Sequence, residues 1–210
     1  VFYFISLILF IFGLNDNVVL CCSFFDSDSY FKENGILNFV YFDQDTVVDE
    51  SAWLRILASY ENAYQEKGVG MLFYGRSKEL NPPLVVSSGS LFSLAILSEV
   101  GSHDRSFFVE CVDYEFCFRL KINDYKIKAI NDEGIDHFSL QDKEQRLVFT
   151  KLINVRCYGP DRVKDFNSSH FKLIAKGFLC KEYFMCIQFT KSLVIFNIKE
   201  YFSRIIKVVF

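Results

Sequence analysis

Two aspartates one residue apart follow an apolar run in residues 38–48 (NFVYFDQDTVV). Carboxylates at this spacing, Asp43 and Asp45, suit a hard divalent cation that also binds phosphate oxygens. Aspartate favours turns, and a DxD pattern often occurs by chance, so the motif is informative mainly through its position after a predicted buried strand.

A second acidic cluster lies in residues 107–120 (FFVECVDYEFCFRL). A helix is predicted over 113–122, which puts Asp113 in its first turn, where an aspartate is most often a cap or a dipole partner. The alternative role is a general base that takes the proton of an acceptor hydroxyl. Glu115 and Arg119 are four residues apart, so we expect them to pair along the helix and orient the site.

Two other segments offer groups to a ligand. Gly89 and Ser90 belong to the run SSGS, whose small residues leave the backbone open. His137 follows a predicted strand and stands among acidic residues, which makes it a candidate third metal ligand. A surface or hydrogen-bonded histidine is the ordinary alternative.

The expected elements alternate between strands and helices, which is typical of α/β proteins. Residues 38–42 are apolar without alternation and predict a central strand of a mostly parallel sheet, with the DQDT turn at its carboxyl end. The other elements predicted in this part are helices over 49–67, 93–100 and 113–122 and strands over 69–74, 84–86 and 125–130.

After residue 142 the sequence changes to apolar segments spaced by lysines, and it predicts two or three helices over 171–210. We therefore divide the chain into a domain over 1–142 and a helical carboxyl-terminal extension over 143–210. The lysines would suit helices in peripheral contact with an anionic membrane surface. Helices packed on the first domain, with lysines in solvent, are an equal alternative.

Composition excludes some functions. The net charge of −3 gives no basic surface for nucleic acid. Seven cysteines without a CxxC pair indicate neither a zinc site nor a disulfide framework, and a reducing cytoplasm is expected. Residues 1–14 predict a buried strand, with a cut-down membrane anchor as the alternative, because a spanning helix needs ~20 residues. The chain opens without Met at a strand-like run, so we expect an amino-terminal truncation.

Three blocks in order resemble the family 2 glycosyltransferases, and within them the bacterial rhamnosyltransferase-like group. The resemblance covers roughly residues 14–142, and it implies an A-type glycosyltransferase fold that lacks its first nucleotide-binding strand. That fold has a mostly parallel central sheet flanked by helices, here with a helical carboxyl-terminal tail. The blocks are FDQDT, SSGSLFSLAILSEVGSHDRSFFVECVDYEFCFRL, and YKIKAI followed by DHFSLQD.

The resemblance also implies roles for individual residues. Asp113 falls where the family has its catalytic base. Asp43 and Asp45 match the motif that binds Mg²⁺ or Mn²⁺ together with the donor diphosphate, and His137 stands where related enzymes have a histidine near the metal.

The implied reaction is inverting transfer of a sugar from a nucleotide-diphosphate donor, which Gly89 and Ser90 are expected to help bind. Rhamnose on a deoxythymidine diphosphate carrier is the suggested donor. The suggested acceptor is a hydroxyl of a lipid-linked or polysaccharide precursor, at the inner face of the cell membrane in the cytoplasm.

Two alternatives remain. Val19 and Phe25 occupy a segment where the family has glycine and asparagine, which favours an inactive fragment or partner-binding remnant of the same fold. A haloacid dehalogenase-type phosphatase would use Asp43 as nucleophile. It would also need a downstream lysine and a paired acidic motif after another strand, which Asp113 and Glu115 at a helix start do not reproduce.

Overall fold

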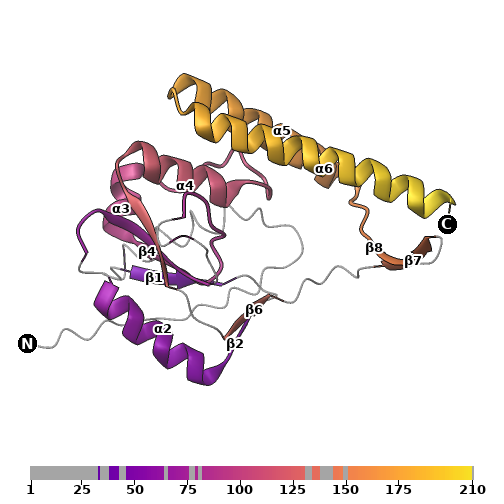
Figure 1. Cartoon of the computed structure of the whole chain (residues 1–210). Coiled ribbons are helices and arrows are strands. Elements are labelled where there is room, and N and C mark those ends of the chain that lie inside the picture. The colour runs from indigo at the N-terminus through magenta and orange to yellow at the C-terminus, as the bar shows by residue number, and fades with distance from the viewer. Residues whose placement is uncertain are drawn as a thin grey trace, which may run out of the picture. The chain divides into compact units, whose positions relative to one another are not determined.

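A computed structural model provides the structure of the chain. The chain divides into two compact units, Val1–Phe138 and Ser139–Phe210 (Figure 1). The sequence prediction puts the boundary slightly later, after residue 142. The predictions for residues 1–14, for Val19 and Phe25, and for Asp43 and Asp45 fall outside the described residues. The structure describes residues 33, 38–42, 46–63, 66–75, 79, 82–130, 134–137, 144–148 and 151–209.

A mixed four-stranded sheet lies at the centre of the first unit, in the order β1-β4-β3-β5. Strand β4 pairs antiparallel with both β1 and β3, whereas β3 and β5 are parallel. The predicted α/β class is confirmed, but the described strands are not mostly parallel, and β1 lies at the edge of their sheet. The strands are β1 (Asn38–Tyr41), β3 (Val69–Tyr74), β4 (Ser90–Ser93) and β5 (Lys126–Ile130).

The difference arises from β4, which the sequence did not predict. Its four residues, SLFS, include no β-branched side chain, yet all of them are buried, and the strand inserts antiparallel between β1 and β3. The strand predicted over 84–86 is irregular in the structure and follows two consecutive prolines, which cannot donate to a sheet ladder.

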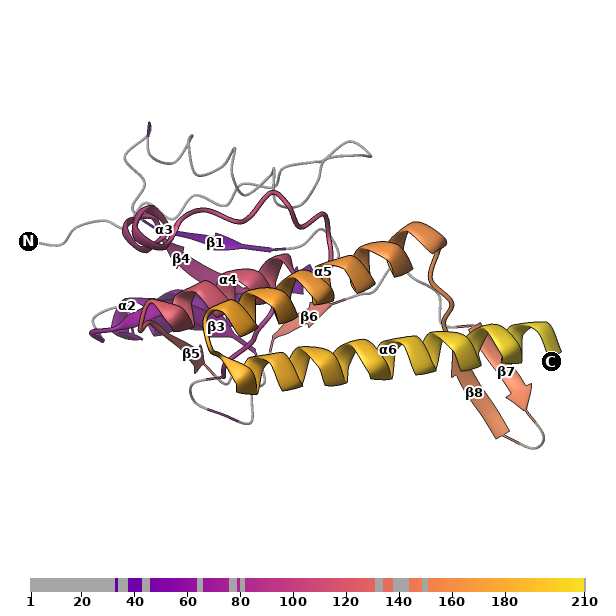
Figure 2. The ribbon, with the colours of Figure 1, turned by 90° about the horizontal axis from the view of Figure 1, so that it is seen from above.

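Helices cover both faces of this sheet (Figures 1 and 2). Alternate residues of a strand point to opposite faces, so Phe92 joins the core beneath α3 (Leu94–Val100) and α4 (Val112–Ile122). Its neighbour Leu91 joins a second core, with Ile56 of α2 (Glu50–Ala63). Each face of the sheet therefore has its own apolar core.

The predicted helices of this unit are confirmed with shifted ends. Asp49 caps α2, because its Oδ1 accepts a hydrogen bond of 2.8 Å from the backbone N–H of Ser51. Gly101 follows α3 with φ 88°, a conformation that favours glycine. In α4, Phe116 and Leu120 are buried as their spacing predicts. The predicted strands over 69–74 and 125–130 are β3 and β5.

The second unit contains a β-hairpin and two long helices. Helices α5 (Pro160–Leu179) and α6 (Tyr183–Val209) lie side by side and confirm the prediction of two or three helices (Figure 2). The antiparallel hairpin of β7 (Glu144–Val148) and β8 (Lys151–Val155) was not predicted. Among the described residues, no helix has the length and hydropathy needed to cross a membrane.

His103, to which the sequence assigns no role, is buried in the first unit. Its ring stacks on Phe116 with centroids 4.6 Å apart and meets the edge of Phe92 at 5.7 Å. Burial lowers the pKa of His103 from 6.5 to about 3, and the positive charge of Arg119 adds to this effect. The imidazole is therefore neutral in the folded protein near pH 7.

This predicts a pH-dependent stability. Because the folded pKa lies below the unfolded one, the unfolded chain binds more protons between pH 3 and 6.5. Stability from this group is complete above pH 6.5 and falls as the pH drops. We expect His103 to lower the free energy of unfolding by about 2 kcal/mol at pH 5 relative to pH 8.

Urea denaturation of the native chain and of His103→Leu at both pH values measures the contribution of His103 to the free energy of unfolding. Between pH 8 and pH 5, the fall in the free energy of unfolding should be about 2 kcal/mol smaller for the variant than for the native chain. An identical pH dependence in the two proteins would contradict a buried neutral His103.

Candidate functional site

The run SSGS forms a buried turn where strands β1 and β3 end. The backbone N–H of Gly89 donates to the carbonyl of Tyr41, the last residue of β1, at 2.8 Å. The carbonyl of Gly89 accepts from the N–H of Tyr74, the last residue of β3, at 3.0 Å. Both strands run antiparallel to β4, so their carboxyl ends share one edge of the sheet. Open α/β sheets bind ligands at this kind of edge.

Gly89 is held in a conformation that only glycine adopts easily. Its φ is 78°, and a Cβ atom built there would lie 2.9 Å from Cδ1 of Ile135 and 3.0 Å from the carbonyl oxygen of Tyr74. Ser90 also serves the turn, since its Oγ donates to the carbonyl of Val86 at 3.1 Å. The structure thus gives both residues a structural role, while their predicted part in donor binding stays a prediction.

Asp113 lies in the first turn of α4 and is half-buried. Its Oδ1 accepts a hydrogen bond from Oγ of Ser87. Cys111, at the amino-terminal cap, is in the left-handed region with φ 65°, an uncommon conformation for a residue other than glycine. The cap residue of α4 is therefore Cys111, and Asp113 is tied to the serine turn by its side chain.

The next serine links the same turn to the DQDT segment. Oγ of Ser88 lies 2.7 Å from Oγ1 of Thr46, within hydrogen-bond distance, and Ser88 is fully buried. Thr46 is the residue that follows Asp45 in the chain. Consecutive serines thus connect the first turn of α4 with Thr46, the residue that follows the DxD motif. Sequence reasoning missed Ser87 and Ser88, although two polar residues next to an apolar run were a usable signal.

Strand pairing brings the backbone of His137 to the same place. Strand β2 (Thr46–Val48) pairs antiparallel with β6 (Ile135–His137), and Thr46 is the direct partner of His137. Directly paired residues have Cα atoms about 4.5–5.5 Å apart. The backbone of His137 is therefore opposite the residue that follows Asp45.

The described side chains do not include the three predicted metal ligands, Asp43, Asp45 and His137. Among the side chains that are described, no group of three or more His, Cys, Asp or Glu residues could hold a metal ion. The predicted metal site therefore stays a prediction, to which the structure adds the register between β2 and β6.

The predicted pair of Glu115 and Arg119 is confirmed. Nε of Arg119 lies 2.8 and 2.9 Å from the two carboxylate oxygens of Glu115, which is fully buried. Nη1 of the same arginine donates to the carbonyls of Val100 and Gly101 at 3.0 and 2.7 Å. The pair therefore binds the carboxyl end of α3 to α4, and so fixes the helix that carries Asp113.

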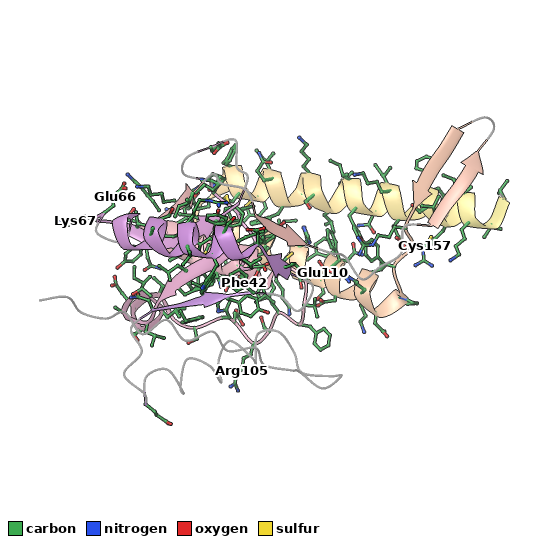
Figure 3. The ribbon with its side chains drawn as sticks, turned by 90° about the horizontal axis from the view of Figure 1, so that it is seen from below. Phe42, Glu66, Lys67, Arg105, Glu110 and Cys157 are labelled. Carbon is green, nitrogen blue, oxygen red and sulfur yellow. The ribbon has the colours of Figure 1, made fainter. Side chains whose placement is uncertain are left out.

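Two other ionisable groups of α4 are poorly suited to proton transfer. Burial raises the pKa of the Cys117 thiol to about 12, and this thiol points to the carbonyl of Val85, 3.6 Å away. Burial, followed by the charge of Asp113, raises the pKa of Tyr114. Glu110, just before the helix, is half-buried (Figure 3). Neither the Cys117 thiol nor the Tyr114 hydroxyl therefore competes with Asp113 as the candidate base.

No model of a known protein family matches this chain, and no curated protein matches it. The function therefore has to be inferred from the residues and the geometry of this site. The connection between Asp113, the serine turn and Thr46 is its most specific feature.

The turn makes Gly89 a sensitive position for stability. Gly89→Ala should combine left-handed strain with the two close contacts of the added Cβ, and we expect a loss of about 2–4 kcal/mol in the free energy of unfolding. Urea denaturation would measure this loss.

Gly68 supplies the matched control. Its φ is 82°, but a Cβ atom there would meet nothing within 4 Å, so Gly68→Ala isolates the conformational strain at about 1–2 kcal/mol. Equal losses in the free energy of unfolding for the two substitutions would contradict the close packing of Gly89 against Ile135 and Tyr74.

Proposed function

We propose that this chain is an inverting glycosyltransferase that moves a sugar from a nucleotide-diphosphate donor to a hydroxyl group. One observation supports the proposal most: the consecutive hydroxyls of Ser87 and Ser88 connect Asp113 to Thr46. A base and a diphosphate-binding segment have to be held close together in such an enzyme, because the acceptor and the donor meet at one carbon atom.

The proposed base is Asp113. Its carboxylate takes the proton of the acceptor hydroxyl, whose oxygen forms a bond to the anomeric carbon while the bond from that carbon to the diphosphate oxygen breaks. Attack from the face opposite the leaving group inverts the carbon. The hydrogen bond from Ser87 orients the carboxylate for this step.

The proposed metal ligands are Asp43, Asp45 and His137. Carboxylate and imidazole donors fit Mn²⁺, and carboxylates with water fit Mg²⁺. The pairing of Thr46 with His137 supports this set, because it brings the histidine backbone opposite the residue that follows the DxD motif. When bound, the ion would supply positive charge to the diphosphate that leaves the sugar.

The remaining parts of the proposal concern the substrates. Gly89 and Ser90 would line the diphosphate side, at the carboxyl ends of β1 and β3. The donor proposed from the resemblance is rhamnose on deoxythymidine diphosphate. The proposed acceptor is a hydroxyl of a lipid-linked polysaccharide precursor at the cytoplasmic face of the cell membrane.

Nucleotide binding tests the metal site. In calorimetric titrations with UDP and with dTDP, we expect binding of one nucleotide that needs Mn²⁺. Asp45→Ala should weaken it at least about tenfold, because a carboxylate ligand is lost. Asp161→Ala, which removes an exposed aspartate of α5, serves as the control and should bind as the native chain does.

Two outcomes would contradict this site. Nucleotide binding that survives chelation of the metal would show that the ion takes no part in the nucleotide site. A folded chain that binds neither nucleotide would favour the inactive remnant.

The role of Asp113 is tested by turnover. Asp113→Asn should keep metal-dependent nucleotide binding and lower transfer by about 10²–10⁴-fold, because the base acts only in the transition state. Glu110→Gln is the matched control for a nearby carboxylate and should retain most of the activity.

Full turnover in Asp113→Asn would refute the assignment. Release of phosphate from a phosphomonoester, without any sugar acceptor, would favour the phosphatase alternative with Asp43 as nucleophile.

A further inference from the structure

The helix α6 has two apolar sides, and only one of them meets α5. The buried side is formed by Met185, Cys186, Phe189 and Leu193, which recur every three to four residues. Many large apolar side chains of α6 are nevertheless exposed. They are Tyr183, Phe184, Ile187, Val194, Ile195, Ile198, Tyr201, Phe202, Ile205, Val208 and Val209.

The exposed apolar residues of α6 lie on one side of the helix. At 3.6 residues per turn they fall within an arc of about 140° centred opposite the stripe that packs on α5. The 27 residues of α6 give this face a length of about 40 Å. We call it the outer face of α6.

Each half of the outer face contains a pair of aromatic residues. Tyr183 and Phe184 precede Tyr201 and Phe202 by eighteen residues, which is five full turns, so the two pairs project from the same side. All four are more than half exposed, at 57–64%. Aromatic side chains are enriched where an apolar phase meets water.

The exposed charges of α6 are all positive. Its only acidic residue, Glu200, is 6% exposed and holds Arg204 at 2.7 Å. The exposed cations are Lys191, Lys199, Arg204 and Lys207. Residues 160–209 carry nine Lys or Arg and four Asp or Glu, although the whole chain has a net charge of −3. The positive charge is therefore concentrated on the two helices.

We propose that the outer face of α6 lies flat on an anionic lipid surface. Its apolar side chains would enter the boundary between headgroups and acyl chains. Lys191, which lies on this face, and Lys199, which lies near its edge, would reach the anionic headgroups. The inference is independent of the proposed transferase activity.

A second copy of the chain fits the outer face less well. A two-fold contact brings the same patch of both copies together, so it would bury the positive charge of Lys191 against like charges. On a membrane, the long stem of Lys191 can lie along the apolar surface while its ammonium group reaches an anionic headgroup.

Flotation of the full chain with lipid vesicles tests the proposal. Vesicles of phosphatidylcholine with one quarter phosphatidylglycerol should bind the chain at least about tenfold better than phosphatidylcholine alone, and 0.5 M salt should remove most of the difference. Equal binding to the two vesicles, or none, would overturn it.

Two double variants separate the apolar and the charged contributions. Ile187→Ser with Ile198→Ser replaces two side chains that are 64% and 51% exposed, so the fold should persist by circular dichroism while vesicle binding falls at least about tenfold. Leu54→Ser in α2 is the control for an exposed apolar residue, at 67%, and should bind normally.

Lys191→Gln with Lys199→Gln should also lower binding to anionic vesicles about tenfold or more. Its matched control is Lys67→Gln with Lys126→Gln, which replaces two exposed lysines of the first unit. Lys67 is labelled in Figure 3. Unchanged vesicle binding in both α6 variants would overturn the proposal. A dimer in analytical ultracentrifugation that the isoleucine variant dissociates would also overturn it, and would assign the face to a second copy.

Discussion

The first unit depends on the buried polar turn formed by residues 87–90. Three serines and one glycine are placed among apolar cores, where an unsatisfied polar group costs about 1–3 kcal/mol. Their hydrogen bonds go to different elements: Gly89 to the ends of β1 and β3, Ser87 to α4, and Ser88 to the start of β2. Satisfying the turn therefore fixes the mutual distances of four elements at one edge of the sheet.

The same constraint explains why a polar site can be rigid in this chain. Asp113 is held from one side by the serine turn, and from the other by its helix, which Glu115 and Arg119 join to the end of α3. A buried ion pair contributes little net stability, but breaking it would leave an uncompensated charge. It therefore specifies one position for α4, as the proposed catalytic role of Asp113 would require.

Local patterns predicted the elements that local physics determines. The sequence predicted a helix over 113–122 and a strand over 125–130, and these are α4 and β5. The features that the sequence did not predict depend on pairing between residues that are far apart in the sequence. Strand β4 is specified by its neighbours rather than by its own residues, and no local pattern encodes the register that joins Thr46 to His137. The fold class and the pair of Glu115 and Arg119 could thus be predicted. Ser87 and Ser88 could be noticed as polar residues next to an apolar run, but their partners, Asp113 and Thr46, could not be predicted.

The two units differ in an important physical respect: the first buries polar groups, whereas the second exposes apolar surface. A helix that packs on one neighbour can bury only one stripe of side chains. A helix that is apolar on two sides therefore keeps one apolar face exposed to solvent. On α6 the charges beside that face have one sign, which favours a negatively charged surface over a copy of the same helix. A chain held at a membrane in this way would meet a lipid-linked acceptor in two dimensions, and the raised effective concentration would compensate for weak acceptor affinity. The two proposals thus have separate physical grounds, but they describe compatible properties of one protein.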